Sequence, residues 1–532
     1  MKAIIKKSIW RNPHSSLFTI HSSLAMSLCF ALLLTSCYSD DSSLGDSASV
    51  PTIEIAEMAE QSVVSYAGNK LVIEPQVTTA YSDNDLQYTW YLYVDKSYSD
   101  KGFRGQVIGT EKKLDYEVNL SSGVYVVTLE VKVKATGLAQ YARTNLSVST
   151  EFSDGFYILK ETADGNTDLD LVTTTGGQST DILTKLNGEP MKGQPVSLAM
   201  VYQQNYVNPD NNEMEMANML NIFTTADYKG YRTEDMRLIF DPKTICYAGD
   251  DNDDVYYNMT NGYNMGIMMS KKGVSSIGMK GTASLSTGKF TLPFVEDDVT
   301  KHIQMCSGGQ RGYAYWSNSK HSVCNIDMNC LGSTVLTTDS TQSQSCVASG
   351  LTRKGAVETV WFLTQEPGTG KRFLHLINGK MAQPIEIREL RPELHISKAT
   401  TVGACGGSAS YIYAIDGRKL YAYGFESDTE VEVPLPGISE PVDLVTNQWL
   451  SLMFGDKQLN YDHLIVGAQN GDTYKLWFFD NLVGGMPTVE AYRTVTGTGK
   501  ARYIRRCTPS VINNMVITMG PRAPMPIFPT SE

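Results

Sequence analysis

Apolar and polar side chains alternate with a period of two along most of the chain from Pro51 onward. In "VYVVTLEVKVKA" (124–135), four aliphatic side chains at alternate positions share one face, and Thr, Glu and Lys side chains occupy the other. The stretches "NKLVIEPQV" (69–77), "LQYTWYLYV" (86–94) and "TNLSVSTEF" (144–152) alternate in the same way. This pattern is typical of half-buried antiparallel strands. The strands occupy about 110 residues with their turns, the size of a β-sandwich.

From Gly155 the pattern changes to recurring hairpins. "GFYILKETADGNTDLDLVTT" predicts two strands joined at Asp164-Gly165, and similar pairs meet at Pro367-Gly368, Asp416-Gly417 and Asn470-Gly471. Hairpins recur at intervals of about fifty residues, which is typical of a β-propeller. The hairpins lie near residues 156, 236, 313, 359, 411, 464 and 503. They predict about seven blades.

Some alternatives stay open within this region. Residues 180–300 are harder to divide into hairpins, so six or eight blades are also compatible with the pattern. Two stacked sandwiches are an alternative to a propeller. "NNEMEMANMLNIF" (211–223) is the best helical candidate, but its flanks favour a loop that leads into a strand.

The predicted fold class is therefore all-β. We divide the chain into a lipoprotein signal peptide (1–36), a flexible acidic tether (37–50), a sandwich (51–154) and a propeller (155–532). The tether is rich in Ser, Asp and Gly, a composition that does not support a packed core.

The chain begins with a targeting pattern. A basic end without Asp or Glu is followed by the apolar run Leu24–Leu34, which is too short to span a bilayer. The residues Leu34-Thr35-Ser36-Cys37 resemble a bacterial lipobox. This resemblance implies that Cys37 is acylated, with palmitate among the acyl chains, and becomes the first residue of the mature protein. An N-terminal anchor helix or a cytosolic tail is the alternative.

The residues after Cys37 suggest where the lipid-anchored chain resides. Ser39, Asp40 and Asp41 resemble the surface-export signal of lipoproteins from a phylum of Gram-negative gut bacteria. The resemblance implies the outer membrane, with the protein facing the cell exterior. A plain solvated tether is the other interpretation, and both can hold together.

The N-terminal strands carry a second resemblance. Trp90 within a strand, followed by Gly123-x-Tyr125 at the turn into the longest strand, resembles the PKD module, a small immunoglobulin-like sandwich. Together with the lipobox, the arrangement is similar to PKD-like family lipoproteins found beside TonB-dependent uptake systems. The resemblance implies a transporter complex as a partner. An unrelated seven-strand sandwich is the alternative.

Composition excludes some partners. The net charge of −12 gives the chain no electrostatic attraction for nucleic acid or for anionic membrane surfaces. The seven cysteines beyond Cys37 are odd in number and include no CxxC pair, so we expect free and mostly buried thiols rather than zinc or redox sites.

Catalytic motifs give little support to an enzyme. HExxH and GxSxG are absent, and the Gly-Lys in "EPGTGKRF" lacks the spacing of a phosphate loop. The sequence indicates no cofactor, although calcium has two weak candidate sites. One is Asp250, Asn252 and Asp254, and the other is Asp164, Asn166 and Asp168.

Two classes of function compete. The first is a non-enzymatic accessory binding protein that captures a nutrient ligand or docks with a TonB-dependent transporter. The second is a surface glycan-active enzyme, either a propeller glycosidase or a polysaccharide lyase. Such chemistry requires two carboxylates, or a Tyr or His base beside a cation. The absence of a catalytic motif favours the first class, and the sequence leaves the ligand open.

Overall fold

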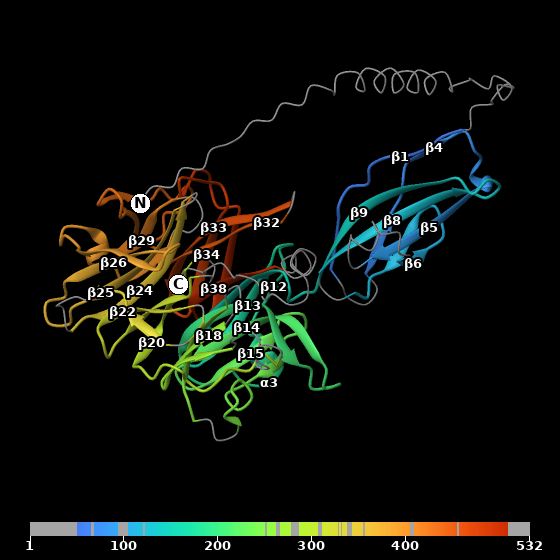
Figure 1. Ribbon diagram of the computed structural model, residues 1–532. Helices are drawn as coiled ribbons and strands as arrows, with labels where there is room; N and C mark the ends of the chain where they lie inside the picture. The colour runs from blue at the N-terminus through green and yellow to red at the C-terminus, as the bar shows by residue number, and fades with distance from the viewer. Residues whose placement is uncertain are drawn as a thin grey trace, which may run out of the picture.

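The polar–apolar alternation folds into an N-terminal sandwich and a C-terminal propeller (Figure 1). The computed structural model describes residues 51–508 apart from 65–68, 94–104, 121–122, 250–252, 262–265, 278–286, 307–310, 328, 331, 338–342, 355–356, 405–408 and 455–456. Within this part of the chain almost all regular structure is strand, as the period of two predicts. None of the helices found there is long and apolar enough to cross a membrane.

The sandwich combines a five-stranded sheet with two short strand pairs. The sheet has the order β2 (Gln61–Val64), β9 (Ala139–Ser149), β8 (Gly123–Val133), β5 (Leu86–Tyr93) and β6 (Gln106–Gly109). The pairs are β1 (Ile53–Ile55) with β4 (Val77–Thr79), and β3 (Lys70–Ile73) with β7 (Leu114–Glu117).

Trp90 is the central side chain of the sandwich. It is 0% exposed, and its indole Nε1 donates a hydrogen bond to the carbonyl of Glu111 at 2.9 Å. Val127, Leu129 and Val131 from β8 are fully buried in the same core. A buried indole needs a partner for its N–H, and the Glu111 carbonyl supplies it. The prediction of Trp90 as a core aromatic is confirmed.

Seven radial sheets, called blades here, form the propeller. Blade 1 is β13 (Pro195–Val207), β14 (Met214–Thr224), β15 (Tyr228–Arg232) and β16 (Arg237–Phe240). Blade 2 is β17 (Tyr256–Asn261), β18 (Gly266–Ser270) and β19 (Gly273–Ser276). Blade 3 is β20 (Val299–Met305), β21 (Tyr313–Ser317), β22 (Ser322–Ile326) and β23 (Ser333–Val335). Blade 4 is β24 (Ser345–Lys354), β25 (Val357–Gln365), β26 (Arg372–Asn378) and β27 (Gln383–Glu389). Blade 5 is β28 (Thr401–Ala404), β29 (Tyr411–Asp416), β30 (Lys419–Gly424) and β31 (Thr429–Glu432).

Blades 6 and 7 complete the propeller, and blade 7 combines the first and the last strands of the propeller region. Blade 6 is β32 (Leu444–Phe454), β33 (Lys457–Asn470), β34 (Thr473–Phe479) and β37 (Arg493–Thr498), and a small hairpin of β35 (Leu482–Val483) and β36 (Met486–Pro487) precedes β37. Blade 7 is β38 (Lys500–Cys507), β10 (Gly155–Glu161), β11 (Thr167–Thr173) and β12 (Gln178–Ser179).

The first strand of each blade lies next to the first strand of the following blade. Contacts run from β13 through β17, β20, β24, β28 and β32 to β38, and β38 contacts β13 again. The seven inner strands therefore surround one axis. Blade 7 closes the ring because its inner strand β38, from the end of the chain, pairs antiparallel with β10. The predicted propeller of about seven blades is confirmed.

Two hairpins were assigned incorrectly. Those near residues 156 and 503 were counted as separate blades, but both belong to blade 7. Blade 2 was missed. It has three strands in the described part, and its outer edge is a single bridge between Val274 and Val295. Short strands and an edge of this kind give too little alternation to be recognised in the sequence.

The local turn predictions are confirmed. The four predicted Asp-Gly, Pro-Gly and Asn-Gly turns join β10 to β11, β25 to β26, β29 to β30 and β33 to β34. "NNEMEMANMLNIF" (211–223) is not helical: residues 211–213 lead into β14, and the remaining residues belong to that strand. The six described cysteines among the seven are free, and five of them are buried.

Candidate functional site

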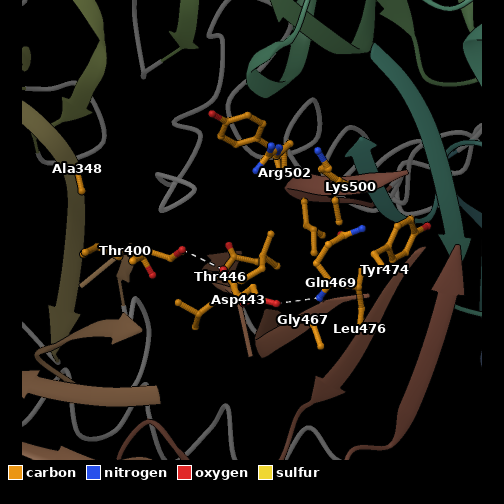
Figure 2. Close-up of a pocket in the computed structure, with 18 of the residues that line it drawn as sticks. Ala348, Thr400, Asp443, Thr446, Gly467, Gln469, Tyr474, Leu476, Lys500 and Arg502 are labelled. Carbon is orange, nitrogen blue, oxygen red and sulfur yellow. Dashed lines mark hydrogen bonds between the residues drawn. The ribbon is translucent and has the colours of Figure 1, made fainter. Parts of the chain in front are cut away.

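A cavity of about 340 Å³ opens where the inner strands of several blades begin (Figure 2). We call it the axial mouth. Its walls come from blades 3 to 7, so residues up to about two hundred positions apart meet there. The described residues that line it are Lys301, His302, Val347, Ala348, Thr400, Thr401, Val402, Asp443, Leu444, Val445, Thr446, Gly467, Ala468, Gln469, Tyr474, Leu476 and Lys500–Arg505. A cavity of this volume falls within the range of small-molecule sites.

Positive charge is concentrated on one wall of the axial mouth. Lys500, Arg502 and Arg505 come from β38, and Lys301 comes from β20. Lys500 and Arg502 are partly exposed, whereas Arg505 is 3% exposed. In a protein of net charge −12, a cluster of four cations in one cavity produces a local field of opposite sign.

Glu161 partly neutralises this wall. It lies opposite Lys500 in the β10–β38 ladder and accepts a hydrogen bond from Arg502 Nε at 3.0 Å. Lys500 Nζ lies 3.8 Å from the other carboxylate oxygen. Glu161 is largely buried beneath both cations, so it holds them in place and leaves an excess of positive charge.

Asp443 is the only carboxylate among the described residues that line the axial mouth, and it has a structural role. Arg418 donates two hydrogen bonds to it, at 2.9 and 2.8 Å. Its Oδ2 also accepts the backbone N–H of Gln469, and its carbonyl accepts the Thr401 hydroxyl. The hydrogen bond to Asp443 raises the pKa of Arg418. Asp443 thus joins blades 5 and 6 (Figure 2).

The opposite wall is aliphatic. Val347 and Ala348 come from β24, and Val402 comes from β28. Figure 2 shows Ala348 on one side of the open space, with Lys500 and Arg502 on the other. Val347 is 40% exposed, so its side chain is available to a ligand. The axial mouth therefore has a cationic wall and an apolar wall.

Polar side chains form the adjoining part of the cavity. Tyr503 accepts a hydrogen bond from Lys301 Nζ at 2.8 Å. The buried His302 lies 3.4 Å from the Ser349 hydroxyl, which also accepts a hydrogen bond from Gln304 at 3.1 Å. These contacts fix the polar side chains before any ligand arrives, which lowers the entropic cost of binding.

The sequence-predicted site residues lie elsewhere. Cys37, Ser39, Asp40, Asp41, Asp250 and Asn252 fall outside the described residues. Asp254 accepts the backbone N–H groups of Val255 and Lys272. No group of three His, Cys, Asp or Glu side chains suited to a metal occurs among the described residues.

The second calcium candidate contributes to local structure. Asp164 accepts hydrogen bonds from Thr162 and Asn166 within the β10–β11 turn. Asp168 is 2% exposed and accepts the backbone N–H of Leu183 at 2.9 Å, near the start of helix α3 (Ile182–Asn187). These bonds account for the alternating acidic and amide residues in this stretch.

Sequence reasoning did not identify the axial mouth. A signal was present in "KARYIRR" (500–506), where four basic residues fall within one predicted strand. The other walls gave no signal, because blades 3 to 5 each contribute two or three residues near the start of one strand and the lining residues of blade 6 are divided among β32, β33 and β34.

The fold and the cavity define a seven-bladed propeller protein with an N-terminal sandwich and an open axial mouth. Residues 37–195 match the model of the PKD-like family. The match begins at Cys37, covers the sandwich and continues through the first three strands of the propeller region to the start of β13. No curated protein matches the sequence.

Several solved structures are similar to this chain. A quinonprotein alcohol dehydrogenase-like protein from Bacteroides thetaiotaomicron is 14% identical, with 87% of this chain and 100% of that chain covered and a TM-score of 0.37. AztD from Citrobacter koseri is 9% identical, with 79% and 100% covered and a TM-score of 0.28. The Dos1 propeller is 9% identical, with 65% and 86% covered and a TM-score of 0.32. The propeller is defined by the seven blades of this chain and the ring that their inner strands form.

Proposed function

We propose that this chain is a cell-surface outer-membrane lipoprotein, anchored through Cys37, that acts as a non-enzymatic accessory binding protein. The propeller captures a ligand at the axial mouth and presents it to a TonB-dependent transporter. The lipobox-like residues before Cys37 and the acids Asp40 and Asp41 support the location. The match to the PKD-like family, which starts at residue 37, is consistent with a mature chain that begins there.

The axial mouth is the observation that carries the binding role. It is open, and its cations are held by neighbouring side chains. Its one described carboxylate, Asp443, is engaged by Arg418. Glycoside hydrolysis by the usual route requires two carboxylates facing the sugar, and the described lining offers no such pair.

A lyase is the second candidate, because Tyr503 and Lys301 form a phenol–cation pair in the axial mouth. Such a pair can abstract a proton from a sugar acid when the phenol loses its own proton to solvent or to a neighbouring base. Tyr503 and Lys301 can equally hold a ligand by hydrogen bonding and charge without reacting with it.

Affinity purification from detergent-solubilised outer membrane tests the proposal, when it is paired with activity screens on glycans and peptides. We expect a TonB-dependent transporter to co-purify and no substrate to be consumed. A variant with Cys37→Ala serves as the control, because it lacks the anchor and should lose the transporter. Turnover of a polymer that disappears in Tyr503→Phe would replace the binding role with the lyase.

A further inference from the structure

The two walls of the axial mouth narrow the chemistry of its ligand. Lys500 and Arg502 line one side, and Val347, Ala348 and Val402 line the other. A ligand in contact with both walls must carry negative charge at one end and apolar surface at the other. A neutral sugar has no charge to pair with the cations and little apolar surface to cover the aliphatic wall. A small inorganic anion can pair with the cations but leaves the aliphatic wall exposed to water.

We propose that the axial mouth binds an organic anion with an apolar body, its carboxylate or sulfate group facing Lys500, Arg502 and Lys301. This deepens the proposed function and rests on the axial mouth being its binding site. Guanidinium and ammonium groups donate charge-assisted hydrogen bonds to such head groups. The aliphatic wall excludes water from the body of the ligand and strengthens those contacts.

The surrounding charges support this orientation. Glu161 lies behind Lys500 and Arg502 and is 9% exposed, so it attracts the cations without presenting its own charge to the cavity. Asp443 belongs to the blade 5–6 side and is neutralised by Arg418. An anion that enters therefore meets a net positive wall.

The test uses the mature chain, residues 37–532 expressed without the signal peptide and carrying Cys37→Ala, so that no acyl chain or apolar leader calls for detergent. It also uses a pair of fluorescent probes. Anilinonaphthalene sulfonate has an aromatic body and a negative charge, whereas N-phenylnaphthylamine has a similar body without the charge. We expect saturable binding of the sulfonate that is at least about tenfold tighter than binding of the neutral probe, a difference of about 1.4 kcal/mol.

Competing ligands show whether negative charge and an apolar body are both required, and whether a carboxylate or a sulfate head group is bound. Octanoate and octyl sulfate present a carboxylate and a sulfate on the same apolar body, and displacement by either one assigns the head group. Octanol lacks the charge and glucuronate lacks the apolar body, so both should compete at least about tenfold more weakly. Octanol that competes as well as octanoate would overturn the proposal, as would glucuronate that does so.

Variants locate the binding. Lys500→Gln combined with Lys301→Gln should weaken sulfonate binding by about tenfold or more, whereas Lys500→Arg should retain it. Lys371→Gln is the matched control, because Lys371 is an exposed lysine paired with Glu389 on blade 4. Equal affinity in the lysine variants and the wild type would overturn the proposal. Transporter co-purification is measured on separate membrane samples, so its outcome distinguishes failure of the proposed function from failure of this inference.

Discussion

His463 lies in a group of aromatic rings on blade 6. Its ring centroid is 5.1 Å from that of Phe156, 5.7 Å from that of Tyr461 and 5.8 Å from that of Tyr492. Burial, with a smaller contribution from the Arg506 charge, lowers the pKa of His463 to about 4. At neutral pH the imidazole is therefore uncharged, and the folded chain resists its protonation.

This environment predicts a pH-dependent stability. In the unfolded chain His463 takes up a proton as the pH falls through about 6.5, but the folded chain takes it up only near pH 4. The free energy of unfolding should therefore fall by about 1.5 kcal/mol from His463 between pH 6.5 and 5. Urea unfolding across this range should give a flatter dependence for His463→Gln. Equal slopes for the variant and the wild type would contradict the assignment.

The environment of a single residue could be predicted from the sequence where the type of side chain alone determines its burial. Trp90 and the free cysteines follow from the fact that large apolar and thiol side chains leave water, and the sequence reveals them directly. Judged by the type of side chain alone, Lys301 and Lys500 are ordinary surface lysines. Their role depends on which strands become neighbours, and that information lies in the tertiary structure.

At the scale of elements, a buried ion pair joins the two strands of the β10–β11 hairpin in blade 7. Lys160 on β10 is 2.7 Å from Asp170 on β11, and their side chains are 1% and 0% exposed. Tyr474 from blade 6 donates a hydrogen bond to Asp170 at 2.6 Å. Although burial opposes the charged amine, hydrogen bonds to Asp170 and Asp181 raise the pKa of Lys160.

Removing one partner should destabilise the folded chain. In Lys160→Met the Asp170 carboxylate stays buried without its cation, which should lower the free energy of unfolding by about 3–5 kcal/mol. Urea unfolding of the full chain measures the loss. Lys371→Met removes an exposed ion pair on blade 4 and should have a far smaller effect. Similar losses in the two variants would show that the buried pair contributes no more to stability than an exposed one.

Hairpins were predictable from local sequence, but their grouping into blades was not. An Asp-Gly or Asn-Gly turn fixes the two strands beside it. The joining of β10 to β38 links residues about 345 positions apart, and no local pattern encodes such a pairing. For that reason the number of blades was right while two of the hairpins were placed wrongly.

At the scale of the whole molecule, the proposed place at the cell surface requires a lipid anchor at Cys37. Radiolabelled palmitate should be incorporated into the wild-type chain and should be absent from Cys37→Ala, because the acylated thiol is lost. Ser36→Ala is the control, since a small residue remains before the cysteine and labelling should persist. Lipid that remains on the Cys37→Ala chain would contradict the lipobox interpretation.

The central claim is that the propeller faces the outside of the cell, where its axial mouth can meet a ligand. Labelling of intact cells with a membrane-impermeant amine reagent, followed by mass spectrometry of the purified chain, tests this claim most directly. Lys371 and Lys419 are exposed and should be labelled, whereas the buried Lys160 should not. Replacing Asp40 and Asp41 with Ala should abolish labelling while palmitate is retained. If Lys371 and Lys419 of the wild-type chain were labelled only after the cells are broken, the surface account would be contradicted.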